Sequence, residues 1–357
     1  MNLRVKLLQK PEEENYERFV CSVNTGLLYY SLKYKNFLER LLTDSRAFYL
    51  VCYEDHQGIV GCLPTFIKYN KSYGNVLNAL PFYGSNGGIL VKENCCFQNE
   101  VYLSLMDAFI DLADKEDAIT STIITNPLNN NHNFYEQHSR YTLHDERIGQ
   151  VTELPVDNNH SDSLPRALMD IFHQKTRNLV RKAIKSGMEV SHSGSLDLIG
   201  RLSELHYQNI AGLGGVAKGI DVFLAIRETF VYDKDYRVYQ AEKDGQIIAA
   251  LLVFFYNRTA EYFTPAVMEE YRSHQPVSLL IFEAMQEASK RGCRYWNWGG
   301  TWTSQQGVYH FKSRFGAIDR PYYYYVRERD QSFRKVDAKV ILSEYPYFYV
   351  LPFSKLD

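Results

Sequence analysis

The chain has 357 residues, and its 40 Lys and Arg nearly balance its 42 Asp and Glu, so the formal net charge is −2. That balance argues against a protein wrapped around duplex nucleic acid, because neutralising a phosphate backbone requires a basic excess. With 45% hydrophobic and 23% charged residues, the composition is globular and has core material for one large domain or two. Tyrosine is unusually frequent, at 28 residues, which fits either partly solvated surfaces such as clefts or ordinary cores.

The first half of the chain predicts two helices, three strands, a loop, a third helix and a fourth strand, in that order. Apolar residues recur at helical spacing in the first two segments, and Asp55 and Gly58 between two apolar runs indicate a hairpin. The predicted segments are helices 11–22 and 29–42, strands 47–53, 59–69 and 75–80, a glycine-rich loop 81–88, helix 97–114 and strand 119–125.

The second half repeats this order, which predicts an internal duplication with domains 1–155 and 164–357. Its segments are helices 164–186, 197–211 and 221–231, strands 237–242, 247–256 and 259–264, loop 265–276, helix 277–291 and strand 293–298. Hairpins require antiparallel neighbours, whereas a strand–helix–strand crossing requires a parallel one. We therefore expect an α/β fold of the α+β type with a mixed sheet in each half.

The cysteines and the apolar runs indicate the compartment. The six cysteines have no C-x-x-C spacing, and Cys95 and Cys96 are adjacent, so we expect neither a metal site nor a disulfide framework. No apolar run has the length of a signal peptide or of a membrane span, which needs roughly 18 residues. These features predict a cytoplasmic protein with reduced thiols and no membrane span.

Three groups of motifs cover nearly the whole chain. Residues 172–190 contain R-N-x-x-R-K-A-x-x-x-G-x-x-V, residues 296–300 and 307–316 contain N-W-G-G and G-V-x-x-F-K-x-x-F-G, and residues 61–64 and 80–89 contain G-x-x-P and L-P-F-x-x-x-G-G-I. These motifs resemble those of the Fem-type and related tandem-GNAT acetyltransferases. The resemblance implies two tandem GNAT-like acyltransferase domains, the first on the acceptor side and the second on the acyl-CoA side.

The resemblance also narrows the range of expected substrates. Fem-type enzymes that use aminoacyl-tRNA commonly carry a long helical arm in the second domain, whereas residues 195–236 predict only two short helices. The chain is therefore more similar to acyl-CoA-dependent N-acyltransferases of surface polysaccharide synthesis. These act on a nucleotide-linked aminosugar, such as a dTDP-linked amino-dideoxyhexose, and transfer an acetyl or hydroxybutanoyl group. We expect acyl-CoA and this aminosugar as partners, with no nucleic acid.

Two alternatives stay open. One is a tRNA-dependent aminoacyl transferase that acts on a peptidoglycan precursor, and the other is a non-catalytic nucleotide-binding protein built on degenerate GNAT halves. Four consecutive tyrosines at 322–325 predict a late strand, which could be ordinary or could be a dimer face, so both a monomer and a homodimer remain possible.

In the related enzymes the CoA diphosphate lies at a helix N-terminus, where free N–H groups and the helix dipole attract anions. The corresponding helix here begins near residue 277. The alternative is an ordinary helix start with Pro276 in its first turn. The candidate acyl-CoA-binding residues are Arg272, Ser273, His274, Gln275, Val277 and Ser278.

A basic helix is the main candidate for binding the acceptor's diphosphate. Arg177, Arg181 and Lys185 share one helix face, where they repel one another and where a polyanion would relieve the repulsion. The alternative is a solvated charged face, with the apolar stripe Phe172, Leu179, Val180, Ala183 and Ile184 buried behind it. The candidate acceptor-binding residues are Lys33, Tyr83, Gly84, Lys175, Arg177, Arg181, Trp298, Trp302 and Lys312, the aromatic ones by stacking.

Four residues are candidates for proton transfer. Glu261 lies mid-strand among apolar neighbours, where a charge is costly unless it has a task or a partner. His206 and His310 could accept the amine's proton, and Tyr309 could protonate the leaving thiolate. Each could equally be structural, since an ordered water can carry the proton. No Ser-His-Asp or Cys-His motif appears, so we expect direct attack of the amine on the thioester.

Overall fold

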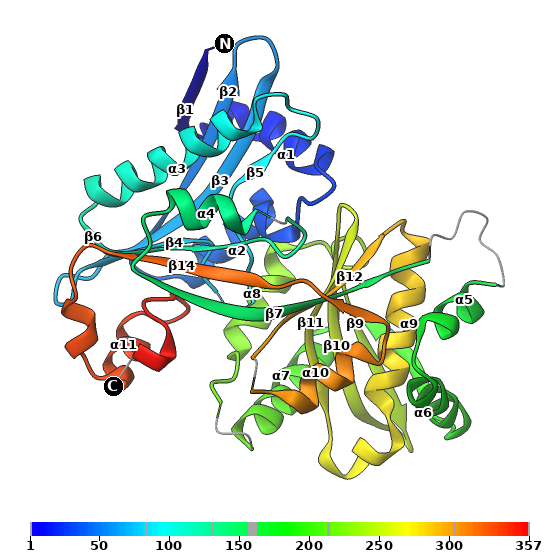
Figure 1. The fold of residues 1–357 in the computed structure, drawn as a ribbon. Coiled ribbons are helices and arrows are strands. Elements are labelled where there is room, and N and C mark those ends of the chain that lie inside the picture. Colours follow the sequence, from blue (N-terminus) through cyan, green and yellow to red (C-terminus); the bar gives the residue numbers. More distant parts are fainter. Residues whose placement is uncertain are drawn as a thin grey trace. The chain divides into compact units, whose positions relative to one another are not determined.

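The computed structural model describes residues 2–82, 84–129, 131–155, 163–212, 215–302 and 304–355 (Figure 1). The chain divides into two compact units: unit 1 is Met1–Arg147 with Pro321–Asp357, and unit 2 is Ile148–Arg320. This division differs from the sequence-based one, because the C-terminal segment belongs to the first unit. No helix in the described part of the chain combines the length and apolar character of a membrane span.

Unit 1 contains a mixed sheet in the order β1-β2-β3-β4-β6-β14-β7. Its neighbours are antiparallel except for β4 and β6, and the short β5 pairs with β3. The bounds are β1 (Leu3–Leu7), β2 (Ser45–Glu54), β3 (Gly58–Lys68), β4 (Asn75–Ala79), β5 (Leu90–Val91), β6 (Ala118–Ile124), β7 (Leu143–Glu153) and β14 (Tyr322–Glu328).

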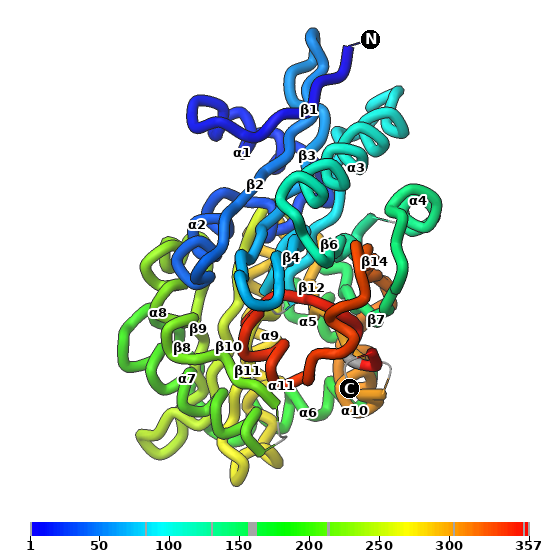
Figure 2. Tube along the Cα trace, turned by 90° about the vertical axis from the view of Figure 1, so that its left-hand side faces the viewer, coloured from blue at the N-terminus to red at the C-terminus, as the bar shows by residue number. Residues whose placement is uncertain are grey.

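Helices cover both faces of this sheet, as Figure 2 shows for β2 and β3. On one side lies α3 (Gln98–Lys115), whose apolar face packs into the core of the unit. On the other side lie α1 (Glu13–Ser22) and α2 (Leu32–Leu41). Ser31 begins α2, since its Oγ accepts a hydrogen bond from the backbone N–H of Tyr34 at 3.1 Å. The shorter helices are α4 (His132–His138) and α11 (Ala338–Glu344).

Unit 2 repeats this plan with a mixed sheet in the order β7-β12-β11-β10-β9-β8. The pair β11 and β12 is parallel, the other neighbours are antiparallel, and β13 pairs with β7. The strands are β8 (Glu189–Ser193), β9 (Tyr236–Lys243), β10 (Gln246–Tyr256), β11 (Thr259–Val267), β12 (Tyr295–Thr301) and β13 (Ala317–Asp319). The helices are α5 (Leu164–Ile171), α6 (Gln174–Lys185), α7 (Leu196–Ala211), α8 (Ile220–Thr229), α9 (Pro276–Lys290) and α10 (Gln306–Ser313).

The core of unit 2 lies between α9 and the sheet. Leu251, Val253 and Phe255 point from β10 toward α9, with α5 and α6 packed beyond that helix. The alternate residue Phe254 contacts Phe230 at the end of α8, with ring centroids 4.9 Å apart. Because successive strand residues face opposite sides, α8 covers the other face.

The duplication is visible in the order of elements, which confirms the predicted mixed α/β fold. Apart from the short β5 before α3, unit 1 runs β1-α1-α2-β2-β3-β4-α3-β6, and unit 2 runs β8-α7-α8-β9-β10-β11-α9-β12. The strand beside β6 is β14, from the C-terminal end of the chain, and the strand beside β12 is β7. Pairing with β14 is the reason why the C-terminal segment belongs to unit 1.

The prediction of a single helix over 164–186 was wrong. Phe172 is extended (φ −77°, ψ 144°) and its ring packs against Phe282 and Phe315, which separates α5 from α6. His173 begins α6, since its Nδ1 accepts a hydrogen bond from the backbone N–H of Lys175 at 3.2 Å. The predicted buried stripe was also partly wrong, because Ile184 is 52% exposed while Thr176 is buried.

Candidate active site

Lys312 brings a buried ammonium group to the end of β12. Its Nζ donates to the carbonyl oxygen of Gly300 at 3.1 Å and to Oγ1 of Thr301 at 2.8 Å. Within the described ranges no carboxylate forms an ion pair with it, and burial lowers the pKa of Lys312 to about 8. The two hydrogen bonds use two of three N–H donors, so the third can donate to a ligand oxygen.

Glu261 is connected to the same end of β12 through an asparagine. Its side chain is 2% exposed, and its Oε2 accepts from Nδ2 of Asn297 at 2.8 Å. Asn297 Oδ1 accepts in turn from the backbone N–H of Gly299 at 3.0 Å. Since Gly299 and Gly300 are adjacent, the hydrogen bonds of Glu261 and Lys312 meet at the irregular end of β12, just after the residues that pair with β11.

A glutamine on β7 completes this network. Thr301 Oγ1 donates to Oε1 of Gln150 at 3.3 Å, and Gln150 Nε2 donates to the carbonyl oxygen of Tyr309 at 3.3 Å. Both Thr301 and Gln150 are buried. The end of β12 is therefore fixed from both sides, by β7 and by α10.

Tyr309 and His310 lie on α10 near the end of β12, but their side chains are more exposed to solvent. Tyr309 Oη donates to Oδ2 of Asp319 at 3.0 Å, and this hydrogen bond raises the pKa of the phenol. His310 is exposed, and its ring lies against that of Tyr309, with centroids 5.4 Å apart. Both side chains remain candidates for proton transfer.

His206 lies on α7, apart from this network. Its Nε2 accepts from the backbone N–H of Lys218 at 3.2 Å, and burial lowers the pKa of His206 to about 4. The imidazole is therefore neutral, but the nitrogen that a general base would use is already occupied. The Lys218 ammonium lies 5.0 Å from the ring centroid of Phe263, and burial lowers its pKa to about 8.

The six candidate acyl-CoA-binding residues lie at the start of α9. Gln275 precedes the helix in a left-handed conformation (φ 63°), with Nε2 donating to the carbonyl oxygen of Arg272 at 3.0 Å and Oε1 accepting from Ser278 Oγ at 3.2 Å. Arg272 forms an ion pair with Glu269 at 2.8 Å. Val277 packs against the core, while Ser273 and His274 lie in the preceding 3-10 helix, with Ser273 Oγ and His274 Nδ1 3.4 Å apart.

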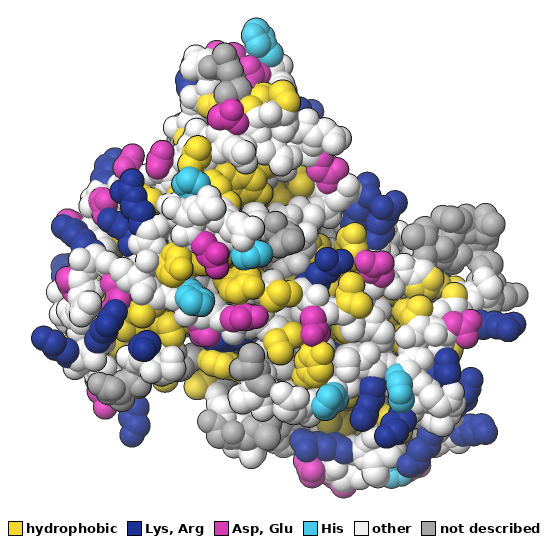
Figure 3. All heavy atoms as spheres, in the orientation of Figure 1, with side chains coloured by type: hydrophobic (Ala, Val, Ile, Leu, Met, Phe, Trp, Pro, Cys, Tyr) yellow, Lys and Arg dark blue, Asp and Glu magenta, His cyan; other side chains and the backbone are white. Residues whose placement is uncertain are grey.

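The basic helix α6 reaches this helix start. Lys182 Nζ donates to the carbonyl oxygen of Ser273 at 3.0 Å. Lys175 and Arg181 are exposed, and Arg177 donates to Oε1 of Gln174 at 2.6 Å. Figure 3 shows Lys and Arg side chains gathered over the region that α6 and α10 occupy, with His side chains among them. The positive charge of α6 thus lies close to the N-terminus of α9, where an anion would bind.

The two candidate tryptophans differ in exposure. Trp298 is 3% exposed, its Nε1 donates to Thr152 Oγ1 at 2.9 Å, and its ring packs against Phe315 and Tyr262. This burial leaves no face for stacking on a ligand, so Trp298 supports the core instead. Trp302 is 39% exposed and remains a stacking candidate.

The remaining candidates belong to unit 1. Lys33 is half-buried on α2, Gly84 is exposed with φ +78°, and Tyr83 lies outside the described residues. The loop around Gly84 is fastened by buried tyrosines. Tyr30 Oη donates to the carbonyl oxygen of Gly87 at 2.5 Å, and Tyr135 Oη accepts from the backbone N–H of Ile89 at 2.7 Å.

Sequence reasoning missed three polar residues of unit 2. Asn297 stands inside the N-W-G-G motif, where its position before two glycines could have marked it as a turn-binding side chain. Lys182 flanks the basic face, and only the contact with Ser273 distinguishes it from its neighbours. No local signal indicates Gln150, because its role depends on β7 pairing with β12.

Comparisons with known proteins agree with this geometry. Residues 172–313 match the family model for an acetyltransferase (GNAT) domain, whereas no curated protein matches the chain. The fold is similar to that in the crystal structure of FemX, with 16% identity, a TM-score of 0.66, and coverage of 90% of this chain and 96% of that one.

Two further structures are similar in fold. One is a tandem GNAT protein from the clavulanic acid biosynthesis pathway, with 13% identity, a TM-score of 0.56, and coverage of 92% and 99%. The other is L-PGS from Bacillus licheniformis, with 13% identity, a TM-score of 0.51, and coverage of 87% and 94%. The chain therefore has a tandem GNAT fold and contains a GNAT acetyltransferase domain at residues 172–313, which supports an acyltransferase activity.

Proposed function

We propose that this enzyme transfers an acyl group from acyl-CoA to the amino group of a nucleotide-linked aminosugar in the cytoplasm, as the FdhC type of sugar N-acyltransferase does. The amine nitrogen attacks the thioester carbonyl carbon, the carbon–nitrogen bond forms, the carbon–sulfur bond breaks, and CoA leaves as a thiol while the amine loses a proton. The observation that carries this proposal is the buried Lys312 ammonium with no described ion pair and one N–H to spare.

Lys312 would stabilise the developing oxyanion. A fixed N–H donor in a water-poor site lowers the transition state more than the ground state, because charge grows on the carbonyl oxygen during attack. Asn297 accepts a hydrogen bond from the backbone N–H of Gly299 and Gln150 accepts one from Thr301 Oγ1, and both bonds hold the end of β12 that contacts Lys312, so these two residues would position the lysine. Glu261 would act through Asn297, and Tyr309 would supply the proton to the thiolate.

The N-terminus of α9 would bind the CoA diphosphate. The backbone N–H groups of Val277 and Ser278 lie in the first turn, and Lys182 and Arg272 add positive charge beside it. The remaining basic residues of α6, Lys175, Arg177 and Arg181, would then bind phosphate groups of either substrate. Lys33, Gly84 and Trp302 are proposed for the acceptor.

A Fem-type transfer from aminoacyl-tRNA is the second candidate, and the similarity to FemX favours it. The absence of a long helical arm does not count strongly against it. Between β8 and β9 the described residues form α7 and α8, and this chain covers 96% of the FemX structure. The two candidates differ in the donor, which makes the donor the quantity to test.

The test measures release of free thiol from acetyl-CoA in the presence of a panel of dTDP- and UDP-linked aminosugars. We expect acceptor-dependent release, with Lys182→Gln raising the KM for acetyl-CoA about tenfold, the loss of one charge-assisted contact. The matched control Lys234→Gln, an exposed lysine of unit 2, should leave the KM unchanged. Transfer from aminoacyl-tRNA to a UDP-linked peptide precursor, without thiol release, would establish the second candidate instead. No turnover with either donor would overturn both.

A further inference from the structure

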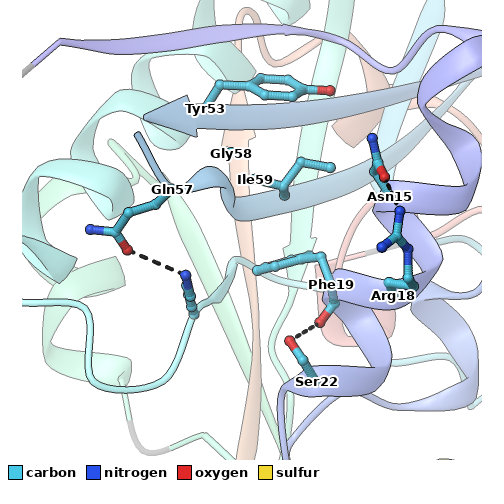
Figure 4. A pocket seen from close by; sticks show the side chains of 9 residues that line it. Asn15, Arg18, Phe19, Ser22, Tyr53, Gln57, Gly58 and Ile59 are labelled. Atoms are coloured by element: carbon cyan, nitrogen blue, oxygen red, sulfur yellow. Dashed lines mark hydrogen bonds between the residues drawn. The ribbon is translucent and has the colours of Figure 1, made fainter. Parts of the chain in front are cut away.

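Unit 1 contains a pocket of about 410 Å³ between α1 and the tip of the β2–β3 hairpin (Figure 4). This volume lies within the range of roughly 300–1,000 Å³ that is usual for small-molecule sites. None of its residues belongs to the candidate active site. Its lining combines polar and apolar side chains.

Three separate segments build the pocket. Arg18 and Phe19 lie three and four residues after Asn15, and Ser22 lies four and three residues after them, so the four residues share one face of α1. The hairpin contributes Tyr53, Gly58 and Ile59, and the segment after β5 contributes Lys92. Phe19 and Ile59 are both nearly buried, and they form an apolar floor.

A positive charge lies at each side of this floor. On one side Arg18 donates to Oδ1 of Asn15. On the other side, where Figure 4 shows Gln57, Lys92 Nζ donates to its Oε1 at 3.3 Å. Both cations are therefore bonded to neutral amide oxygens, which leaves their charges available to an anion.

The neighbouring carboxylates do not neutralise these charges. Glu93 accepts from the backbone N–H and the Nδ2 of Asn24 at 2.6 and 2.7 Å, and Glu12 pairs with Lys6 at 2.6 Å. Glu14 lies 4.0 Å from Arg18, but its side chain is 88% exposed, and such a pair is largely screened by water. The pocket thus presents two cations separated by an apolar floor.

We infer that this pocket binds a small dianion, a dicarboxylate in which a short apolar body separates the two acidic groups. One carboxylate would bind Arg18, whose planar guanidinium fits a carboxylate with two hydrogen bonds, and the other would bind Lys92. The apolar body would lie on Phe19 and Ile59. This inference is independent of the proposed acyl transfer, because it involves none of the same residues.

The test is titration of the full chain with straight-chain dicarboxylates from succinate to suberate, followed by calorimetry and by backbone amide chemical shifts. We expect affinity to peak at one chain length and to exceed that of hexanoate at least tenfold. Arg18→Gln and Lys92→Gln should each reduce the affinity for the best diacid to the hexanoate level. The control Lys71→Gln, an exposed lysine of unit 1, should change nothing.

Three results would overturn the inference. They are affinity that does not depend on chain length, hexanoate binding as well as the best diacid, and no shift of the α1 or hairpin amides at ~20 mM of any diacid, far above typical ligand constants. Arg18 is exposed, so its substitution should not unfold the protein, and an unchanged thermal midpoint would verify this.

Discussion

Replacing Lys312 by methionine tests whether its ammonium is truly desolvated. The substitution keeps an unbranched side chain that is one atom shorter, and it removes the charge from a site where no carboxylate pairs with it among the described residues. In the folded protein the pKa is about 8, against an ordinary value of 10.5. Burial therefore disfavours the charged form. The folded wild-type protein is destabilised at every pH at which this lysine is protonated in the unfolded chain, that is, below about 10.5.

The size of the effect follows from that difference. A gap of about 2.5 pKa units corresponds to about 3 kcal/mol, present in full below pH 8. Between about pH 8 and 10.5 the unfolded state binds more protons than the folded state, so the free energy of unfolding rises with pH. From about pH 7 to pH 10 the wild type should gain about 2–3 kcal/mol relative to Lys312→Met, whatever constant offset the lost hydrogen bonds add.

Urea unfolding of the two proteins at about pH 7 and pH 10 measures this difference, and groups that both proteins share cancel. Lys234→Met, at an exposed site, serves as the control and should show a difference that does not change with pH. A Lys312→Met difference that is equally flat would show that the ammonium is solvated, and the reasoning about the site would fail. If Lys312 is an oxyanion donor, the variant should also lose about 100- to 1,000-fold in kcat.

Three further substitutions test individual contacts. Asn297→Ala removes the amide that donates to Glu261, and should lower the urea midpoint by the equivalent of about 1–3 kcal/mol; an unchanged midpoint would mean that water replaces the amide. Gly87→Ala would place a Cβ 2.4 Å from the carbonyl oxygen of Ala79 and should cost about 1–3 kcal/mol in the same assay, whereas a neutral result would show that the loop can move aside. Tyr135→Phe leaves the buried N–H of Ile89 without its acceptor, so hydrogen exchange at Ile89 should accelerate more than at distant amides.

Local patterns in the sequence were sufficient to predict the repeated helices and strands. The hairpin around Asp55 and Gly58 and the run of apolar residues in β10 depend on nearby residues, and both were predicted. The interruption at Phe172 was not, because its extended backbone results from packing against Phe282 and Phe315, which are far along the chain. The strand β7 was missed for the same reason, since its polar residues alternate poorly and its pairing partners are remote.

Prediction of the candidate site was limited in the same way, by contacts between residues far apart in the sequence. Lys312 was identified from its motif as an acceptor-binding candidate, and this role stays a prediction; its hydrogen bonds to Gly300 and Thr301 could not be read from the motif. The burial of Trp298 could not be predicted, because an aromatic residue in a strand can face either the core or a ligand. The role of Asn297 depends on the parallel pairing of β11 with β12, which places Glu261 opposite it. Side chains that act through distant strands are therefore the ones that single-sequence reasoning misses.

The use of β14 as the partner of β6 has a consequence for how the chain folds as it is made. The strands described for unit 2 all precede residue 321, whereas β6 has no β14 partner until Tyr322–Glu328 has been synthesised. The roughly 200 intervening residues take about 10–40 s to synthesise at about 5–20 residues per second. During that time unit 2 can fold first, while unit 1 exposes the unpaired edge of β6, which is a template for aggregation. Nascent chains that stop short of β14 should accordingly be the ones that chaperones retain.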